Sequence, residues 1–178
     1  VTFGDKNALA VMRKQAGDTS ATTDKRLVAL RSLLNLDDPD LVPTLLSLLK
    51  ADAGLREQAI RGLAQYDDPT IAPALLQAYP ELTAGQKRAA LATLCSRATS
   101  GIALLGAIDS DQIAGTDLTA DLVRQLQFLS NKKIDSLLES VWGVARESAA
   151  DKLAMIQQYT QLVGSNEHPV ADPELGRT

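Results

Sequence analysis

The chain contains an internal repeat with a period of 30 residues. Segments 33–46 and 63–76 each hold an Asp-Asp-Pro step, a second Pro four residues later and a Leu-Leu pair at equivalent places. The match extends upstream, where Arg31 corresponds to Arg61. It therefore covers a helix, a turn and a second helix, and a repeat of this kind indicates a solenoid of stacked helix pairs.

The amino-acid composition predicts an all-α fold. Hydrophobic residues make up 45 % of the 178 residues and aromatic residues only 3 %, and most of the apolar residues are Leu or Ala, which favour helices. A chain of this length can bury about 70 % of its unfolded surface, enough for one stable domain. We expect residues 1–164 to form a right-handed α-α superhelix of about four helix pairs with flanking helices.

Apolar residues at three- and four-residue spacing predict the helices of the first unit. A helix over 5–16 is expected to precede this unit, and Asp24 is expected at the N-cap of its first helix. Arg26 is expected to point away from the apolar stripe. The two stripes of the unit comprise Leu27, Leu30, Leu33 and Leu34, then Leu41, Leu45, Leu48 and Leu49.

Three further units and a cap are expected to complete the stack. The second unit spans about 55–78, and Pro80 is expected to break its last helix. The third unit lacks the proline signature, because 98–101 reads Ala-Thr-Ser-Gly where the earlier units have Asp-Asp-Pro. Residues 130–133 join the two helices of the fourth unit. A final helix over 148–163 is expected to cover the last unit, since a solenoid end has no neighbour over its apolar face.

The Asp-Pro steps mark the turn inside each repeat. Asp38-Pro39 and Asp68-Pro69 suit a helix start, because the carboxylate accepts from free backbone N–H groups and Pro lacks the N–H that would be left unpaired. Pro43 and Pro73 lie four residues further on, which predicts either a kink or a short turn before a helix that begins there. We assign these paired carboxylates to capping of the turns rather than to acid–base catalysis or calcium binding.

Arg31 and Arg61 recur at the same place in the repeat and are the candidate interaction residues. In a stack of helix pairs, a repeated Arg can bond to an aspartate of the next turn and form a ladder that orients the units. The alternative is that the two arginines line a binding surface, because solenoids bind partners through repeated exposed residues.

No constellation typical of catalysis or metal binding is present. Cys95 and His168 are the single cysteine and histidine, so the sequence offers no Cys-x-x-Cys pair, no cysteine-based zinc site and no multi-histidine metal site. Asp109, Asp111 and Asp117 approach the spacing of a calcium loop, but Ile stands at its fifth position and the glycine comes one place late. We expect Cys95 in the core, His168 in solvent, no cofactor and no enzymatic activity.

The charge balance disfavours nucleic acid as a partner. The net charge is −4, and no run of five or more Lys or Arg occurs that would hold a phosphate backbone. Apolar runs are far shorter than the roughly 18 residues of a membrane span. Segment 165–178 is polar and contains two prolines, so it is expected to be a linker toward a further domain. We expect a monomeric fragment of a longer protein, bound to a protein partner or to neighbouring domains.

The Asp-Asp-Pro-x-x-x-Pro-x-Leu-Leu units resemble HEAT repeats, in which two antiparallel helices stack into a curved solenoid. The resemblance covers about 27–78, and the later units resemble the pattern more loosely. It implies a HEAT-like superhelix that acts as a scaffold for protein interaction.

The second half of the chain carries a narrower resemblance. The second half is similar to the stretch that precedes the haem-binding segment in large exported proteins of the planctomycete and verrucomicrobial type, at residues 107–113, 117–119, 123–126, 138–143 and 172–177. Those proteins join a propeller-like dehydrogenase domain, a HEAT-like middle and a C-terminal cytochrome c domain. The resemblance implies a connecting role in an electron-transfer protein and an exported or periplasmic location. The haem attachment motif of that family would follow Thr178, so no residue here is assigned to haem.

Two functions therefore stand side by side. The first is a non-catalytic scaffold that connects a dehydrogenase-like domain to a cytochrome c domain or presents a face to a protein partner. The alternative is a HEAT-like binder of nucleic acid or a small ligand, such as a DNA glycosylase-type enzyme, which needs a cationic groove with stacking aromatic residues. The arrangement of five arginines distinguishes the two: Arg31, Arg61, Arg88, Arg97 and Arg124.

Overall fold

The computed structural model describes residues 6–51, 54–141 and 157–161, and this part of the chain contains helices and turns but no strand. The elements are α1 (Lys6–Gly17), α2 (Thr23–Asn35), α3 (Val42–Ala51), α4 (Arg56–Leu63), α5 (Ile71–Ala78), η1 (Tyr79–Glu81), α6 (Ala84–Leu94), α7 (Ala98–Asp109), η2 (Gly115–Asp117) and α8 (Ala120–Phe128). Residues 132–141 and 157–161 are also helical. The predicted all-α fold is confirmed.

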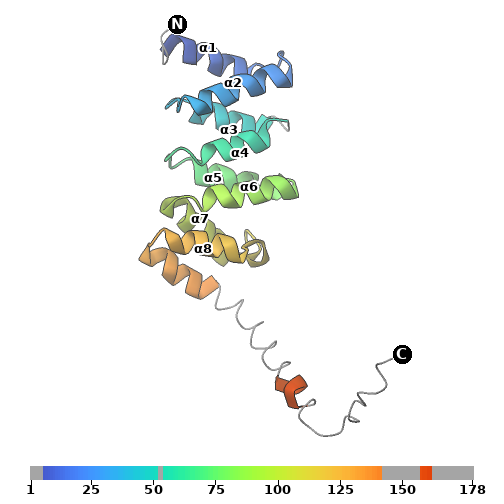
Figure 1. Cartoon of the computed structure of the whole chain (residues 1–178), viewed down its shortest axis with the longest axis vertical. Helices are drawn as coiled ribbons and strands as arrows, with labels where there is room; N and C mark the ends of the chain where they lie inside the picture. The colour runs from blue at the N-terminus through green and yellow to red at the C-terminus, as the bar shows by residue number, and fades with distance from the viewer. Residues whose placement is uncertain (1–5, 52–53, 142–156, 162–178) are drawn as a thin grey trace, which may run out of the picture.

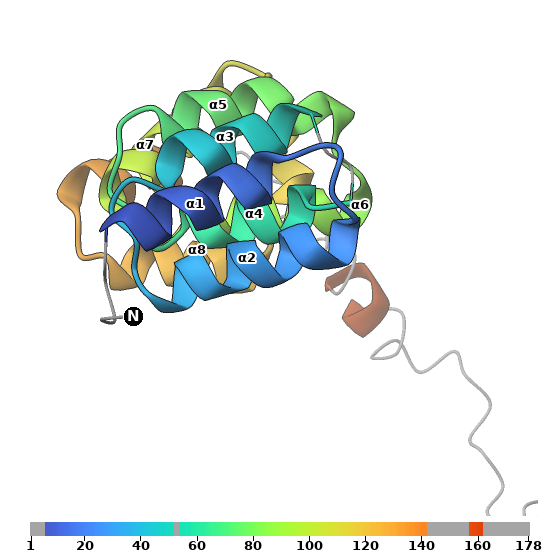
Figure 2. The same cartoon turned by 90° about the horizontal axis from the view of Figure 1, so that it is seen from above.

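The helices stack as a two-layer solenoid (Figure 1). Seen along the stack, α1, α3, α5 and α7 lie on one side, and α2, α4, α6 and α8 lie on the other (Figure 2). In the odd-numbered layer α1 contacts α3, α3 contacts α5 and α5 contacts α7, while α4 contacts α6 in the even-numbered layer. Contacts between the layers include α1 with α2, α3 with α4 and α6 with α7. Each unit is therefore held mainly by its neighbours, as in other solenoids.

The repeated leucines form the core between the two layers. Seven of the eight leucines in the two predicted stripes are buried, and Leu27 is partly buried. Burial of one such side chain contributes about 1.5–3 kcal/mol. The fully buried leucines Leu30, Leu33 and Leu45 of the first unit have their repeat partners in Ile60, Leu63 and Leu75 of the second, which are also fully buried.

Two glycines, one in each layer, allow their helices to pack closely against neighbouring helices. A Cβ atom at Gly62 of α4 would lie 2.8 Å from Leu34 Cδ2 of α2 and 3.3 Å from Leu45 Cδ2 of α3. A Cβ atom at Gly101 of α7 would lie 2.7 Å from Leu126 Cδ2 of α8. Larger side chains would overpack these contacts and push the helices apart.

The start of α2 differs from the sequence-based expectation at two residues. The helix begins at Thr23, with Thr22 in extended conformation at the N-cap, so Asp24 lies in the first turn. Arg26 does not point away from the apolar stripe: it is 5 % exposed, and its Nε donates to the Ala16 carbonyl at 3.0 Å. The aliphatic stem of Arg can pack in the core while its guanidinium satisfies a carbonyl at the end of α1.

The structure fixes the first residues of α3, α5 and α7, which the sequence left open. A short turn precedes α3 and α5, which start at Val42 and Ile71, so Pro43 and Pro73 lie in first turns where their missing N–H costs no helix hydrogen bond. In the third unit 98–101 is not a connecting turn but the first turn of α7. Helix α5 ends at Ala78 and Pro80 lies in η1, as predicted. Most of the expected cap at 148–163 and the whole of the expected linker at 165–178 lie outside the described residues.

In the described part of the chain, three helix ends adopt the left-handed conformation without glycine. The residues are Asp37, Asp111 and Ser130, with φ of 49°, 57° and 50°. After α2, the Asp37 N–H donates to the Leu34 carbonyl and the Asp38 N–H to the Leu33 carbonyl, both at 3.2 Å. This is the Schellman pattern, which satisfies the last carbonyls of the helix and sets the direction of the turn.

Candidate functional site

The turn between α2 and α3 is held by an ion pair with α1. Arg13 Nη1 lies 2.6 Å from Asp38 Oδ1 and 2.7 Å from Oδ2, and it lies 3.5 Å from Asp40 Oδ2. The Asp38 side chain is 1 % exposed, and its Oδ1 also accepts from the Asp40 N–H at 3.3 Å. Asp38 therefore joins the first helix of the stack to the first repeat, and the adjacent Pro39 is exposed.

The equivalent turn between α4 and α5 uses its aspartate differently. Asp68 Oδ1 accepts from the backbone N–H of Thr70 at 2.8 Å and from the Thr70 hydroxyl. These two hydrogen bonds lower the pKa of the Asp68 carboxyl. Thr70 is the residue before α5, so Asp68 closes the turn that leads into the helix. Pro69, like Pro39, is exposed.

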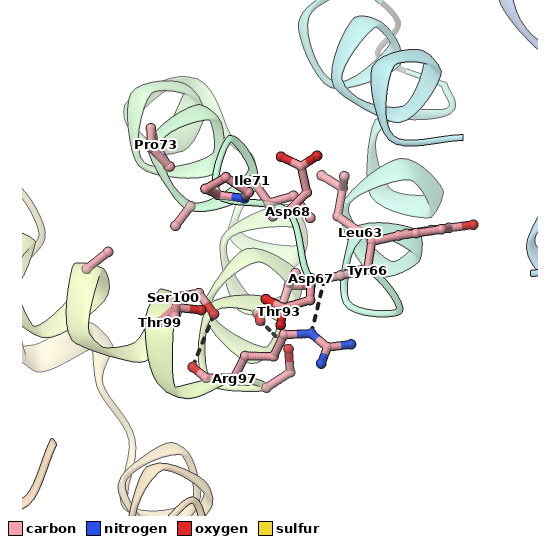
Figure 3. A pocket seen from close by; sticks show the side chains of 14 residues that line it. Leu63, Tyr66, Asp67, Asp68, Ile71, Pro73, Thr93, Arg97, Thr99 and Ser100 are labelled. Carbon is pink, nitrogen blue, oxygen red and sulfur yellow. Dashed lines mark hydrogen bonds between the residues drawn. The ribbon is translucent and has the colours of Figure 1, made fainter. Parts of the chain in front are cut away.

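Arg97 crosses from the third unit to the same turn. Its Nε donates to the Tyr66 carbonyl at 3.1 Å (Figure 3). Its Nη2 donates to the Gln65 and Ala64 carbonyls at 3.0 and 3.5 Å. The guanidinium therefore satisfies carbonyls that follow the end of α4. A cleft of about 280 Å³ lies beside this contact, between the α4–α5 and α6–α7 turns, and we name it the turn cleft.

Three of the four serine and threonine hydroxyls that line the turn cleft donate to backbone carbonyls. Thr93 Oγ1 donates to the Ile60 carbonyl at 3.0 Å, Ser96 Oγ to the Thr93 carbonyl at 2.7 Å, and Ser100 Oγ to the Arg97 carbonyl at 3.2 Å. None of these contacts is with a general base that could activate a hydroxyl.

Tyr66 contributes a buried hydroxyl to the same region. In Figure 3 its ring points away from Arg97 and Ser100. The Tyr66 oxygen is buried and has no hydrogen-bond partner among the described residues. Burial, together with the negative charges of Asp38 and Asp37, raises the pKa of Tyr66 to about 12. The tyrosine thus lies between the two repeat turns and remains a neutral phenol at physiological pH.

The repeated arginines named from the sequence lie on the even-numbered helices. Arg61 Nη2 is 2.7 Å from Glu57 Oε1 of its own helix, so this ion pair does not reach an aspartate of the next turn. Arg31 of α2 is exposed and makes no side-chain bond with the described residues. The structure does not bring the two arginines into one contact.

A different arginine pair makes the recurring contact. Arg26 and Arg56 are also 30 residues apart. Arg56 Nε donates to the Leu49 carbonyl at 2.8 Å, just as Arg26 donates to the Ala16 carbonyl at the end of the preceding helix. The 30-residue spacing of the two arginines could have indicated this recurring contact. Hydrophobic periodicity alone assigns a charged residue to the surface.

The even-numbered layer contains a second hollow, of about 450 Å³, which we name the α6 groove. Helix α6 forms its floor with Gly85, Ala89 and Ala92, and Arg88 also lines it. Glu57 and Arg61 of α4 line one side, and Gln125 of α8 lines the other. No aromatic side chain of the described residues lines the groove.

The five arginines that distinguish the two functions are only partly clustered. Arg61 and Arg88 share the α6 groove, whereas Arg97 is bound to carbonyls at the turn cleft. Arg31 and Arg124 are exposed on α2 and α8 without lining the groove. The cationic groove with stacking aromatics that a glycosylase-type site requires is not formed by the described residues.

The remaining candidate residues are buried or bonded to other side chains, or they lie outside the described residues. Cys95 is fully buried, and this burial raises the pKa of its thiol to about 12. Asp117, from the suspected calcium loop, accepts from the Tyr79 hydroxyl at 2.9 Å. Among the described residues no group of three or more His, Cys, Asp or Glu is arranged to hold a metal ion.

No described helix is long and apolar enough to cross a membrane. His168 lies outside the described residues.

Comparison with known families agrees with the geometry of the stack. Residues 9–95, from α1 to the end of α6, match a family model of HEAT repeats. The matched segment includes both Asp-Asp-Pro turns and most of the α6 groove. Neither curated proteins nor solved structures gave a match to the chain. This part of the solenoid is therefore HEAT-like, and HEAT repeats generally mediate protein interactions.

Proposed function

We propose that the chain is a non-catalytic scaffold that binds a protein partner through the even-numbered layer of its HEAT-like solenoid. The observation that carries this proposal is the α6 groove, an open hollow that spans three consecutive units and contains Arg88, an exposed cation without a partner among the described residues. Solenoids commonly use such extended surfaces, built from several repeats, to bind other chains.

The chemistry of the turn cleft supports a non-catalytic role. The hydroxyls of Thr93, Ser96 and Ser100 donate to backbone carbonyls, and the Arg97 guanidinium donates to three carbonyls of the α4–α5 turn. An activated nucleophile would need a base within hydrogen-bond distance. These contacts hold neighbouring units together.

We further propose that the scaffold connects a dehydrogenase-like domain to a cytochrome c domain in a longer exported protein. Support comes from the sequence similarity of 107–113, 117–119, 123–126, 138–143 and 172–177 to the stretch that precedes the haem-binding segment in such proteins. In this role the solenoid would set the distance and orientation between a substrate-oxidising domain and an electron acceptor.

An extended gene product tests the connecting role. The reading frame that continues beyond Thr178 is expressed with a cytochrome c maturation system, and the absorption spectrum of the purified protein is recorded. Covalently attached haem is the expected result, because the similarity predicts a Cys-x-x-Cys-His motif shortly downstream. Absence of that motif and of haem would reject the cytochrome connection.

Sedimentation tests the scaffold role separately. The chain and the neighbouring domains of its parent protein are purified apart, mixed and centrifuged. Association is expected, and it should weaken when the α6 groove is altered. Independent sedimentation of all components would contradict the scaffold.

A further inference from the structure

The shape of the α6 groove suits an extended chain. Its floor consists of small residues, among which Ala92 is exposed, Gly85 is half-buried and Ala89 is buried. Because these side chains end at Cβ or before it, the backbone of a bound peptide could approach α6 closely. Gln125, on the α8 side, makes no hydrogen bond with the described residues and offers both a donor and an acceptor to a peptide amide.

The charge of the groove is opposite to that of the whole chain. The net charge is −4, yet the groove contains Arg61 and Arg88 against the single carboxylate of Glu57. Arg61 already pairs with Glu57, whereas the Arg88 guanidinium is exposed and unpaired among the described residues. Arg31 and Arg124 add exposed cations on α2 and α8, which lie before α4 and after α6 along the stack (Figure 1).

Most of the exposed acidic residues in the described part of the chain lie outside α2, α4, α6 and α8, on which Asp24, Glu57 and Asp121 are exposed. Asp37 and Asp67 are exposed at the two repeat turns, and Asp109 and Asp111 are exposed at the end of α7. This separation creates a locally positive face on an acidic protein, and such a face orients and attracts a negatively charged partner. A long polyanion would also meet the acidic turns, so a short acidic segment fits the distribution better than a nucleic acid.

We propose that the α6 groove binds an acidic, extended segment of a partner protein, whose carboxylates pair with Arg88 and whose backbone lies over the small residues of α6. This inference rests on the proposed scaffold function and names the partner's chemistry. Arg88 supplies a charge-assisted, forked contact to a carboxylate. Arg61 can share its guanidinium between Glu57 and the ligand.

Peptide binding to the full chain tests the proposal. The probe is a dye-labelled peptide that alternates Glu and Ala, and its anisotropy is measured against a matched peptide with Gln in place of Glu. The acidic peptide is expected to bind at least about tenfold more tightly than the neutral one, with an affinity that falls as salt rises. Equal binding of the two peptides, or binding of neither, would overturn the assignment of the groove to an acidic segment.

Two variants probe the groove by different means. Arg88→Glu reverses the charge, and Ala92→Leu fills the floor without changing the charge; each is expected to weaken binding about tenfold or more. The matched controls are Lys133→Glu and Ala10→Leu, which make the same changes at exposed helical residues outside the groove and should leave affinity within about twofold. Circular dichroism checks that all four variants keep their helices. Unchanged binding by either groove variant would overturn the proposal.

The outcomes also separate this inference from the scaffold function. If an oligothymidylate displaces the acidic peptide and binds more tightly, the groove is a polyanion site and the peptide proposal falls. If Arg88→Glu abolishes peptide binding and the neighbouring domains still co-sediment with the chain, a different face carries the scaffold function. If the peptide does not bind but the domains associate, only the groove assignment is rejected.

Discussion

The α2–α3 and α4–α5 turns contain the same Asp-Asp-Pro sequence but are stabilised in opposite ways. In the first turn Asp38 is buried, and a helix earlier in the chain supplies its partner, Arg13. In the second turn the Asp68 side chain is more exposed and accepts from Thr70, while Arg97 from a later unit donates to the backbone carbonyls. One turn is anchored through its side chain and the other through its main chain.

This difference shows that a repeated sequence does not fix the contacts of a repeat. Each turn is bound by the neighbour that happens to lie against it, and the neighbours of the two turns differ in sequence. The residue before Asp-Asp also differs, since Leu36 stands where the second repeat has Tyr66. Stability is therefore shared between units, and equivalent substitutions should have unequal effects.

The two aspartates should differ most. Asp38→Asn leaves the guanidinium of Arg13, whose side chain is only 21 % exposed, without its carboxylate, and we expect a loss of about 2–3 kcal/mol in the free energy of unfolding. Asp68→Asn keeps an acceptor for Thr70 and should cost much less. Urea denaturation of both variants measures the difference. Equal losses would show that burial of Asp38 does not distinguish the turns.

Removal of the arginine that crosses to the second turn should have the next largest effect. Arg97→Ala leaves carbonyls of the α4–α5 turn without their donor, and we expect a loss of about 1–2 kcal/mol. Arg97→Lys should restore only part of it, because an ammonium cannot reproduce the fork of a guanidinium. Thermal unfolding followed by circular dichroism provides the measurement. Full rescue by Lys would indicate a purely electrostatic contact.

Two tyrosines form a matched test of buried hydroxyls. Tyr66→Phe removes a buried oxygen without a partner among the described residues and should raise stability by up to about 1 kcal/mol. Tyr79→Phe removes a hydroxyl that donates to Asp117 and should lower stability by about 1 kcal/mol. Opposite signs in the same denaturation assay are expected. A loss in Tyr66→Phe would reveal a water that bonds to its hydroxyl.

Tyr66 also predicts a pH dependence. Its pKa rises from 10.0 in the unfolded chain to about 12 in the folded protein, so the folded state retains the proton longer. Its contribution is therefore complete below pH 10 and is lost as pH rises toward about 12. Tyr66→Phe should show a shallower alkaline decline than the unsubstituted protein. Tyr79, whose pKa is also raised by burial and by Asp117, accounts for a remaining decline.

The smallest effect should come from the first aspartate of each pair. Asp37 has φ of 49°, so Asp37→Gly relieves a left-handed conformation and should be neutral or slightly stabilising. Asp67 is not among the described residues with positive φ, so Asp67→Gly should cost about 0.5–1 kcal/mol through backbone entropy alone. Guanidinium denaturation resolves the pair. Identical behaviour would mean that the two turns share one backbone geometry.

The stacked helix pairs and their core could be predicted from the sequence, because helical periodicity and the 30-residue repeat place the recurring leucines on stripes, and seven of the eight leucines in the first unit's stripes are buried. The contacts of the arginines could not be. Arg13 meets Asp38 across 25 residues and outside the repeat, and hydrophobic patterning gives no register for that pair. Arg26 was wrongly placed at the surface, because patterning treats the residue as a charge and ignores its long apolar stem.

The α6 groove was also beyond prediction from sequence. It depends on how three helices are spaced, and the third unit has lost the proline signature that would align it with the others. Its floor residues Gly85, Ala89 and Ala92 form no recognisable sequence motif. They can be identified as a groove only in the folded chain, where Arg61 and Gln125 flank them. Of the expected arginine surface, the groove contains Arg61 and Arg88.

The rate at which Cys95 reacts with an alkylating reagent can report local opening of this solenoid. The thiol is fully buried at the end of α6, and its raised pKa leaves almost no thiolate at neutral pH. An alkylating reagent can therefore modify it only after the third unit opens. The rate of modification therefore reports how often the part of the stack that carries the α6 groove opens. A bound partner would lower this rate without contacting the sulfur.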